Sequence, residues 1–210
     1  MKTEIILLRH TKVIGPAALY GVTDVKSNEQ DNLNLAQLFP QKFQLLNNII
    51  SSPLQRCSRL ADMLFEQYPL SDQYPKSVIY NRQFQEMNFG EFDGVPFDQL
   101  KDKWQKLELF WQQPKNVEFT SGENLTQFNQ RVTTAWLQLL KKYRGQTSLL
   151  VCHGGVIRMI LAEVLRLDWS ASELYSNLAI ANGSVTKISF NDAECQFPKV
   201  EFIGMPLLIS

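Results

Sequence analysis

The 210-residue sequence predicts an α/β fold in which helices cover both faces of a mainly parallel sheet. Short apolar runs alternate along the chain with longer segments of helical periodicity, which is the pattern of strands joined by crossover helices. Hydrophobic residues make up 44 % of the chain, and no repeat or low-complexity segment divides it. We therefore expect a three-layer α/β/α sandwich built as one domain over residues 1–210.

The strands are expected where short apolar or β-branched runs end at charges or turn residues. Ile5–Leu8 is wholly apolar and stops at Arg9, as a strand buried on both faces does. The two runs nearest the C-terminus alternate in polarity, as half-exposed strands or an antiparallel edge strand do. The predicted strands are Ile5–Leu8, Asn48–Ile50, Ser77–Tyr80, Ser148–Cys152, Val185–Phe190 and Lys199–Ile203.

Helical patterns fill the intervals between these strands. Ser52 is a candidate N-cap before Pro53, and Thr120-Ser-Gly-Glu123 has the spacing of a capping box. The last helical segment is apolar almost all round, so we expect it to be buried. The predicted helices are Pro53–Tyr68, Phe97–Gln112, Gly122–Tyr143 and Gly154–Leu167, and the polar stretches 66–77 and 113–122 are expected to be surface loops.

Composition and charge argue against several functional classes. The 21 Lys and Arg residues balance 21 Asp and Glu residues, which disfavours nucleic-acid binding through a broad basic face. The three cysteines are odd in number and widely spaced, so we expect reduced thiols in a cytoplasmic protein. The chain has only two histidines, which disfavours a zinc site. The first apolar run is too short for a signal peptide or a membrane span, and no membrane association is expected.

Polar side chains follow three predicted strands at the point where each strand ends. Arg9 and His10 come directly after the first strand, Arg56 lies just beyond the second, and His153 and Gly154 follow the strand at 148–152. Ligands of open parallel sheets bind beyond these carboxyl ends. Arginine forks match phosphate oxygens, and backbone N–H groups at the start of a helix bind anions. The sequence therefore predicts a phosphate site at this edge of the sheet.

Each of these residues also has a purely structural interpretation. A histidine at a strand end is more often a structural residue than a catalyst, but here the only two histidines both follow a buried strand, which favours function. Arg56 alone would be a solvated helix arginine, and that interpretation is kept for Arg59, Arg131 and Arg158. Cys152 is interpreted as a packing residue.

Five segments resemble, in the same order, the motifs of the histidine phosphatase superfamily, which includes the cofactor-dependent phosphoglycerate mutases. Any one of them is a weak signal, but together they span residues 7 to 158 and are specific. The resemblance implies a phosphoglycerate mutase-like fold. The segments are Leu-Leu-Arg9-His10-Thr11, Ser-Ser-Pro-Leu-Gln-Arg56-Cys, Gln85-Glu86-Met-Asn-Phe-Gly90-Glu-Phe-Asp-Gly94, Ser121-Gly122-Glu123-Asn124 and Val-Cys-His153-Gly-Gly-Val-Ile-Arg.

The resemblance implies phosphoryl transfer in two steps through His10. A neutral His10 would attack phosphorus in line and become phosphohistidine. Arg9, Arg56, a protonated His153 and the backbone at Gly154 would bind the phosphoryl oxygens and offset the charge that develops on them. No cofactor or metal ion is needed, because side chains supply the positive charge.

Glu86 is the residue that the resemblance implies as general acid. It would protonate the leaving oxygen and then activate the water that hydrolyses phosphohistidine. Without the motif, Glu86 would be interpreted as a carboxylate of a surface loop. Glu91 and Asp93 lie in the same segment and are rival acids.

Two positions depart from the family pattern, and one stretch resembles a branch of the family. Thr11 replaces a glycine, and Pro16 replaces the asparagine six residues after the histidine. The segment from Arg9 to Val25 resembles the alpha-ribazole phosphatase-like proteins of cobalamin nucleotide-loop assembly. This resemblance implies alpha-ribazole 5′-phosphate as the substrate, with Tyr20 and Thr23 as candidate substrate-binding residues.

Several alternatives stay open. A broad-specificity phosphatase and a phosphoglycerate mutase-type enzyme use the same motifs, although the segment after Gly94 lacks the arginine cluster of such mutases. A non-catalytic module that binds a phosphorylated ligand is disfavoured because His10 and Glu86 are both present. The expected partner is a small phosphorylated metabolite. The apolar tail Ile203–Ile209 either docks on the core or lines a homodimer contact.

Overall fold

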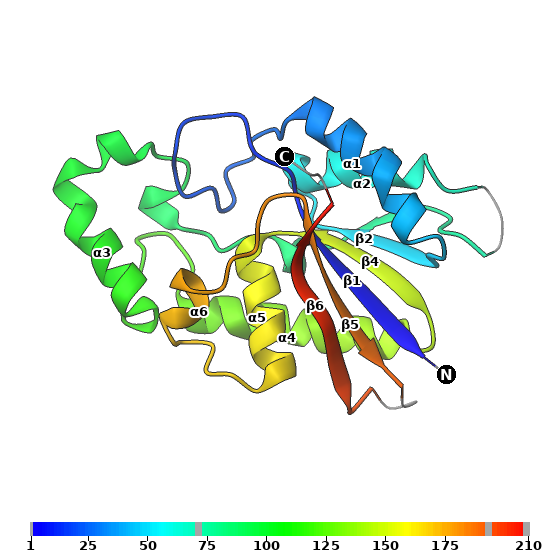
Figure 1. The fold of residues 1–210 in the computed structure, drawn as a ribbon. Helices are drawn as coiled ribbons and strands as arrows, with labels where there is room; N and C mark the ends of the chain where they lie inside the picture. Colours follow the sequence, from blue (N-terminus) through cyan, green and yellow to red (C-terminus); the bar gives the residue numbers. More distant parts are fainter. Residues whose placement is uncertain (1, 70–72, 192–194, 208–210) are drawn as a thin grey trace.

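A computed structural model describes residues 2–69, 73–191 and 195–207, and it places six strands in one sheet (Figure 1). The strand order is β3-β2-β4-β1-β5-β6. The first four strands in this order pair parallel, whereas β5 pairs antiparallel with both of its neighbours. The strands are β1 Thr3–Arg9, β2 Asn48–Ser51, β3 Val78–Tyr80, β4 Thr147–Cys152, β5 Ser184–Phe190 and β6 Pro198–Pro206.

Helices cover both faces of this sheet, so the predicted three-layer sandwich is confirmed (Figure 1). Helices α1 and α2 pack on one face, and α4 and α5 pack on the other. No described helix combines the length and the apolar character that crossing a bilayer requires. The helices are α1 Glu29–Lys42, α2 Gln55–Phe65, α3 Trp104–Gln112, α4 Leu125–Lys142, α5 Gly154–Leu165 and α6 Glu173–Ser176.

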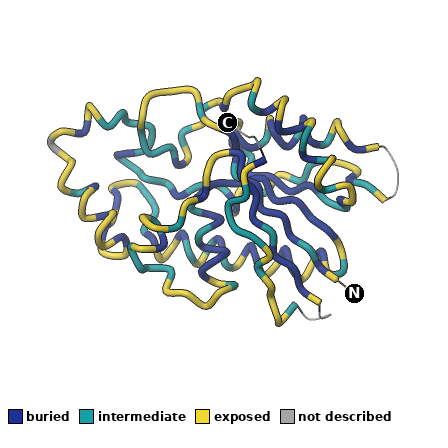
Figure 2. The backbone as a smooth tube through the Cα atoms, viewed as in Figure 1, coloured by how far each residue is buried: buried dark blue, intermediate teal, exposed yellow. Residues whose placement is uncertain are grey.

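Strand β1 divides the core into two halves, because side chains alternate between the faces of a strand. Ile5 and Leu7 contact the apolar side chains of α4 and α5, whereas Ile6 and Leu8 contact those of α1 and α2. All four are at most 1 % exposed, and full burial of such a side chain is worth about 1.5–3 kcal/mol. Every residue of β4 is buried, and so is every residue of β1 except the half-buried Glu4 and Arg9 (Figure 2).

The two C-terminal strands differ from each other. Strand β6 is the expected antiparallel edge strand and is partly exposed. Strand β5 was expected to be half-exposed, but all of its residues except Lys187 are buried, because it lies between β1 and β6. Of the apolar tail Ile203–Ile209, the first four residues extend β6 and Leu207 packs into the α1–α2 side of the core. Leu208 and Ile209 lie outside the described residues.

Helix α1 has no counterpart among the predicted helices. The Asn28 side chain caps it by accepting from the Asp31 amide, and Leu35 and Phe39 lie on its buried face. The polar residue Asn32 lies on the same buried face and is also fully buried. Pro40 lies within the helix. A polar residue on the apolar face and an internal proline together obscure the helical periodicity in the sequence.

Asn32 is buried because it is the centre of a hydrogen-bonded network. Its Oδ1 accepts from the Thr11 hydroxyl at 2.5 Å, and its Nδ2 donates to Ser27 Oγ at 3.0 Å. The Ser27 hydroxyl also contacts the Arg56 carbonyl oxygen at 3.4 Å. Thr11, which departs from the glycine of the family pattern, therefore ties the segment after β1 to α1.

The predicted start of α2 is wrong. Pro53 and Leu54 precede the helix, which begins at Gln55, and Ser52 is not its N-cap. The acceptor at the helix start is Asp24, whose Oδ1 lies 2.7 Å from the Gln55 amide nitrogen. Because Asp24 is distant in the sequence, local patterns could not indicate it as a cap.

Other predicted boundaries also shift. Helix α4 begins after Asn124, which forms a capping box with Gln127. The segment predicted as one helix over Phe97–Gln112 contains two short 3-10 turns before α3. The stretch 113–122 is not wholly on the surface, since Val117 and Phe119 are buried in the core beside α4.

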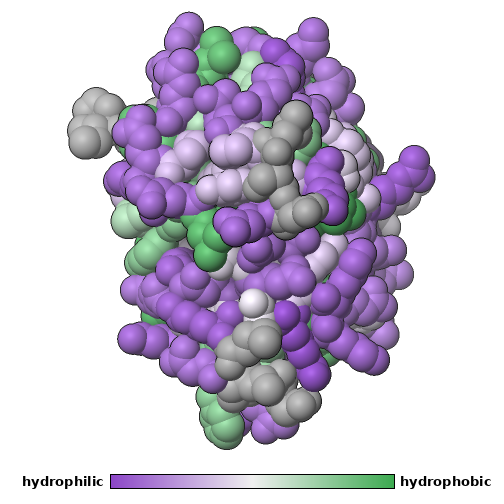
Figure 3. Space-filling view, turned by 90° about the vertical axis from the view of Figure 1, so that its right-hand side faces the viewer, coloured by the Kyte–Doolittle hydropathy of each residue, from purple (hydrophilic) through white to green (hydrophobic). Residues whose placement is uncertain are grey.

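The surface at the amino ends of the parallel strands is mainly hydrophilic, with scattered apolar side chains (Figure 3). Single apolar residues of this kind are normal on protein surfaces. The residues predicted to bind phosphate follow the carboxyl ends of β1, β2 and β4, at the other end of the sheet.

We expect Asn32→Ala to lower the free energy of unfolding by about 1–3 kcal/mol, because the buried hydroxyls of Thr11 and Ser27 lose their partner. Asn34→Ala on the exposed face of the same helix is the matched control and should change stability little. Urea denaturation measures both variants. Equal stabilities would show that the network contributes nothing to the fold.

Candidate active site

A cavity of about 560 Å³ lies at the carboxyl end of β1. Its lining brings together residues from the ends of strands and from three separate loops. Of the residues predicted for the site, Arg9, His10, Tyr20 and Glu86 line this cavity. The other lining residues are Lys12, Val13, Gly15, Pro16, Ala17, Ala18, Leu19, Phe89 and Asn182.

His10 carries its lone pair on Nε2. Its Nδ1 lies 2.7 Å from the Thr11 carbonyl oxygen, which can only accept, so Nδ1 bears the proton. Burial, followed by the positive charges of Arg56 and Arg9, lowers the pKa of His10 to about 3. His10 is therefore neutral at pH 7, and its Nε2 carries the lone pair of the ring.

Asn182 holds the Thr11 carbonyl group that faces His10 Nδ1, and it was not among the predicted site residues. Its Nδ2 donates to the carbonyl oxygens of His10 and Thr11, at 3.0 and 3.3 Å. The next residue, Gly183, donates its amide to the carbonyl oxygens of Arg9 and His10. In the sequence, Asn-Gly indicates only a turn before β5. The pairing of β5 with β1 is what brings this turn to the site.

Arg9 has a buried donor with no partner among the described residues. Its Nη1 donates to the Ile180 carbonyl oxygen, but its Nε is buried and forms no hydrogen bond. Buried N–H groups are nearly always paired, so an unpaired one at a cavity points to a ligand. At the start of α5, a Cβ added to Gly154 would lie 3.4 Å from this Nε. The same Cβ would lie 3.0 Å from Arg158 Nη1, so the start of α5 lies close to both arginines.

Arg56 lies beside the cavity, fully buried, and does not line it. Its guanidinium donates to the carbonyl oxygens of Tyr20, Gly21 and Thr23, and its Nε donates to His153 Nδ1 at 3.2 Å. These bonds occupy four of its five N–H groups. Arg56 therefore holds the loop over residues 20–23 in place, and one of its N–H groups is not used by these bonds.

His153 is neutral, not protonated as the family resemblance implied. Its Nδ1 accepts from Arg56, so the proton lies on Nε2, 2.8 Å from Ser52 Oγ. Burial, and then the charge of Arg56, lowers the pKa of His153 well below its usual range. Its ring meets the ring of His10 edge-on, with centroids 5.2 Å apart.

Glu86 is the one of the three candidate acids that lines the cavity. Its Oε2 accepts from the Gly155 amide at 2.9 Å, and its Oε1 accepts from the Met87 amide at 3.1 Å. A Cβ added to Gly155 would meet Glu86 Oε1 at 2.3 Å, so this close approach requires glycine. The carboxylate therefore lies at the N-terminal end of α5, bonded to one of its first backbone amides.

The rival acids have structural roles. Glu91 accepts from Lys106 and Lys103, each at 2.9 Å, and these bonds lower the pKa of Glu91 to about 2. The Asp93 carboxylate accepts from four backbone amides, those of residues 21, 22, 23 and 89. Neither side chain lines the cavity.

The two candidate substrate-binding residues lie in different places. Tyr20 lines the cavity, and its hydroxyl donates to the Pro16 carbonyl oxygen at 2.8 Å. Thr23 does not line it, because its backbone is bound by Arg56 and Asp93. Pro16 also lines the cavity and offers no side-chain donor where the family pattern has asparagine.

Two arginines predicted to be solvated are not. Arg158 donates to the carbonyl oxygens of Leu174 and Leu178, and its burial lowers the pKa of Arg158. Arg131 is bound to Glu123. Arg59 is exposed as predicted and pairs with a surface glutamate. The helix faces of Arg158 and Arg131 are covered by distant loops, which local periodicity does not indicate.

The two histidines predict how stability depends on pH. Both have a pKa lowered by folding, whereas an unfolded histidine titrates near pH 6.5. Below pH 6.5 the unfolded chain therefore binds more protons, and the free energy of unfolding falls as the pH is lowered towards 5. Each histidine should contribute a slope of up to about 1.4 kcal/mol per pH unit. Urea denaturation between pH 7.5 and 5 measures this slope.

His10→Gln is the variant that assigns the slope to one residue. It should reduce the slope below pH 6.5 and leave the nearly flat region above pH 7 unchanged. An unaltered slope in this variant would mean that His10 is protonated in the folded state at these pH values.

The chain is similar to known phosphatases and mutases. The model of the histidine phosphatase superfamily (branch 1) matches residues 5–202. A 2,3-bisphosphoglycerate-dependent phosphoglycerate mutase of Bartonella henselae is 26 % identical over 144 residues, 67 % of each chain. A putative phosphoserine phosphatase 2 of Hydrogenobacter thermophilus is 26 % identical over 156 residues, which cover 73 % of this chain and 72 % of that protein.

Solved structures agree with the fold. The structure of Bacillus stearothermophilus YhfR superposes with a TM-score of 0.83 at 22 % identity and covers 97 % of both chains. A mycobacterial glucosyl-3-phosphoglycerate phosphatase superposes with a TM-score of 0.77 at 19 % identity, covering 97 % of this chain and 99 % of that one. Because the family model extends over nearly the whole chain, the protein belongs to branch 1 of the histidine phosphatase superfamily.

Proposed function

We propose that the protein is a phosphomonoesterase that acts through phosphohistidine at His10 and needs no metal ion. The observation that carries this proposal is the free Nε2 of a neutral His10 in a cavity shared with Glu86 and the unpaired Nε of Arg9. The membership of a family of phosphatases and mutases supports it. The three free cysteine thiols fit action in the cytoplasm.

In the first step, His10 Nε2 forms a bond to phosphorus while the bond from phosphorus to the ester oxygen breaks. Glu86 donates its proton to that oxygen, which leaves as an alcohol. The Nε of Arg9, the remaining N–H of Arg56 and the start of α5 at Gly154 bind the phosphoryl oxygens. Each such donor is worth about 2–4 kcal/mol in the transition state.

In the second step, water attacks the phosphohistidine. Glu86, now ionised, accepts a proton from the water, and the bond from phosphorus to His10 Nε2 breaks. Inorganic phosphate leaves and His10 returns to its neutral form. His153 keeps its place through both steps as the neutral ring that bonds Arg56 and packs against His10.

Alpha-ribazole 5′-phosphate is the substrate that we propose. The resemblance of residues 9–25 supports it, and so does the cavity, whose volume suits a small-molecule ligand. Six of the thirteen lining residues are apolar and fit an organic group, namely Val13, Pro16, Ala17, Ala18, Leu19 and Phe89.

Two alternatives to this substrate stay open, a phosphoglycerate and a broad range of alkyl phosphates. The likeness to the Bartonella mutase favours a phosphoglycerate, whose carboxylate would need a cation such as Lys12 in the lining. A broad-specificity phosphatase would accept many alkyl phosphates in the same cavity. Values of kcat/KM across a panel of phosphorylated metabolites separate these substrates. Phosphate binding without turnover would instead favour a non-catalytic module.

The phosphoenzyme is the direct test of the mechanism. After rapid quenching in alkali, we expect acid-labile phosphate on a single peptide that contains His10, with chelator present throughout. His10→Ala should lose both the label and the activity. Label on His153 instead, or turnover that stops with chelator and returns with Mg²⁺, would contradict the proposal.

The role of Glu86 depends on the leaving group. An alkyl phosphate expels a basic alkoxide that needs a proton, whereas a nitrophenyl phosphate expels a stable phenolate. In Glu86→Gln, single-turnover cleavage of the alkyl ester should fall by about two to four powers of ten. The pre-steady-state burst of nitrophenolate should be largely retained. Equal losses with both esters would show that Glu86 holds the phosphate or the loop and is not the acid.

A further inference from the structure

The loop that carries Glu86 has no regular secondary structure to hold it. It runs between the 3-10 turns Arg82–Phe84 and Gly90–Phe92. The Glu86 carboxylate itself is bound by two backbone amides, one of them from its own neighbour Met87. A general acid must be held within hydrogen-bond reach of the leaving oxygen. Contacts from elsewhere in the fold must therefore fix the backbone of this loop.

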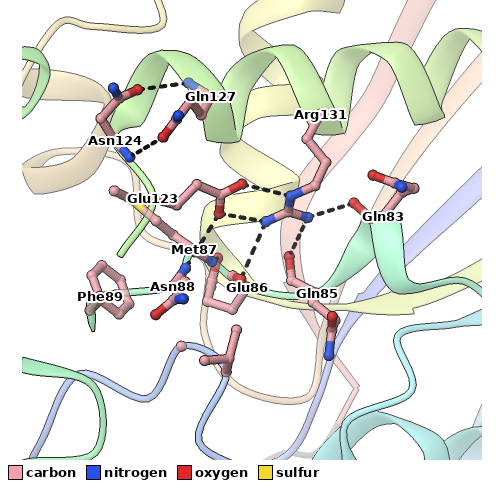
Figure 4. Close-up of polar contacts among 12 residues, drawn as sticks. Gln83, Gln85, Glu86, Met87, Asn88, Phe89, Glu123, Asn124, Gln127 and Arg131 are labelled. Carbon is pink, nitrogen blue, oxygen red and sulfur yellow. Dashed lines mark hydrogen bonds and ion pairs between the residues drawn. The ribbon is translucent and has the colours of Figure 1, made fainter. Parts of the chain in front are cut away.

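Arg131 of α4 supplies these contacts from outside the cavity (Figure 4). Its Nη1 donates to the carbonyl oxygens of Gln83 and Gln85, at 2.8 and 3.1 Å. Its Nη2 lies 3.4 Å from the Glu86 carbonyl oxygen. One planar guanidinium thus binds three backbone carbonyl groups, the last of which belongs to Glu86 itself.

Glu123 orients this guanidinium. Its Oε1 accepts from Arg131 Nε and its Oε2 accepts from Arg131 Nη2, both at 2.7 Å, in the bidentate geometry that is strongest for this pair. The two side chains are 16 % and 20 % exposed, whereas those of the surface pair Arg59 and Glu29 are 52 % and 53 % exposed. The Glu123–Arg131 pair is therefore the less screened of the two.

Glu123 also holds the far side of the loop. Its amide donates to the Asn88 carbonyl oxygen at 2.8 Å, and its Oε2 lies 3.4 Å from the Asn88 amide nitrogen. Glu123 stands directly before the capping box of Asn124 and Gln127, so it projects from the rigid start of α4 (Figure 4). The loop backbone is therefore bound on both sides of Glu86, by Arg131 within α4 and by Glu123 just before it.

We propose that Arg131 and Glu123 are positioning residues for Glu86, an inference that rests on the proposed function. Neither lines the cavity. His10 and Arg9 are held by other contacts, those of β1, Asn182 and Ile180. We call the contacts that Arg131 and Glu123 make with the loop of Glu86 the clamp. Loss of the clamp should impair protonation of the leaving group and spare phosphate binding and the attack by His10.

The test compares two esters in Arg131→Ala. A displacement of about 1 Å can cost roughly 100-fold in rate, so single-turnover cleavage of an alkyl phosphate should fall by about 10- to 100-fold. The nitrophenolate burst and the inhibition constant of inorganic phosphate should stay near the wild-type values. Arg59→Ala removes an exposed ion pair of the same type and is the matched control, with no change in either rate.

Glu123→Gln is the second variant, and it keeps a side chain of the same shape should Arg131→Ala fail to fold. It weakens the bidentate pair and should shift the alkyl rate in the same direction by a smaller factor. In a Glu86→Gln background, Arg131→Ala should add almost no further loss with the alkyl ester, because both changes act on the same proton transfer.

Three results would overturn the clamp. These are a wild-type alkyl rate in both single variants, equal losses with the alkyl and aryl esters, or additive losses in the double variant. Failure of the proposed function is recognised separately, by a wild-type protein that forms no phosphohistidine. If the wild-type protein forms phosphohistidine and its alkyl phosphatase activity depends on Glu86, any of the three results refutes the clamp and leaves the proposed function standing.

Discussion

The parallel register of β1 and β4 places Arg9 opposite Cys152, and the rest of the site depends on this pairing. The His10 amide donates to the Cys152 carbonyl oxygen at 3.1 Å, so the hydrogen-bond ladder continues one residue beyond the strand. Parallel strands end at the same edge, and the rings of His10 and His153 are therefore brought into contact. Because both strands are fully covered by helices, a slip in this register would expose apolar side chains as well as separate the histidines.

Burial affects the histidines and the arginines of the site in different ways. The histidines are neutral because a buried imidazolium beside arginines is unfavourable. The arginines keep their charge because backbone carbonyl groups solvate them, and Arg56 alone bonds three. A neutral nucleophile next to fixed cations is the combination that attack on a phosphate ester requires. The Nε of Arg9 is a buried donor that the described residues leave unpaired, and the proposed function assigns it to a phosphoryl oxygen.

The loops around the cavity are held by carboxylates that do not line it. Asp93 binds the amides of the 20–23 loop, and Glu123 with Arg131 binds the loop of Glu86. Irregular segments must satisfy their backbone groups with side chains or water. Glu86, Glu91 and Asp93 lie within eight residues of one another and look equivalent in the sequence, yet only Glu86 lines the cavity. Their partners, and not their residue type, distinguish them.

The sequence by itself determined the two strands at whose ends Arg9, His10 and His153 lie, because a buried strand is a local apolar run and the residue after it is at the sheet edge. It also determined the family, through motifs that are contiguous. Only the tertiary structure decided the features that depend on distant partners: Asn32 hidden in the apolar face of α1, the Asp24 cap of α2, Asn182 beside His10, the neutral state of His153 and the clamp on Glu86. In each case a polar group is buried, and its free energy depends on whether a partner far along the chain satisfies it, which no local pattern records.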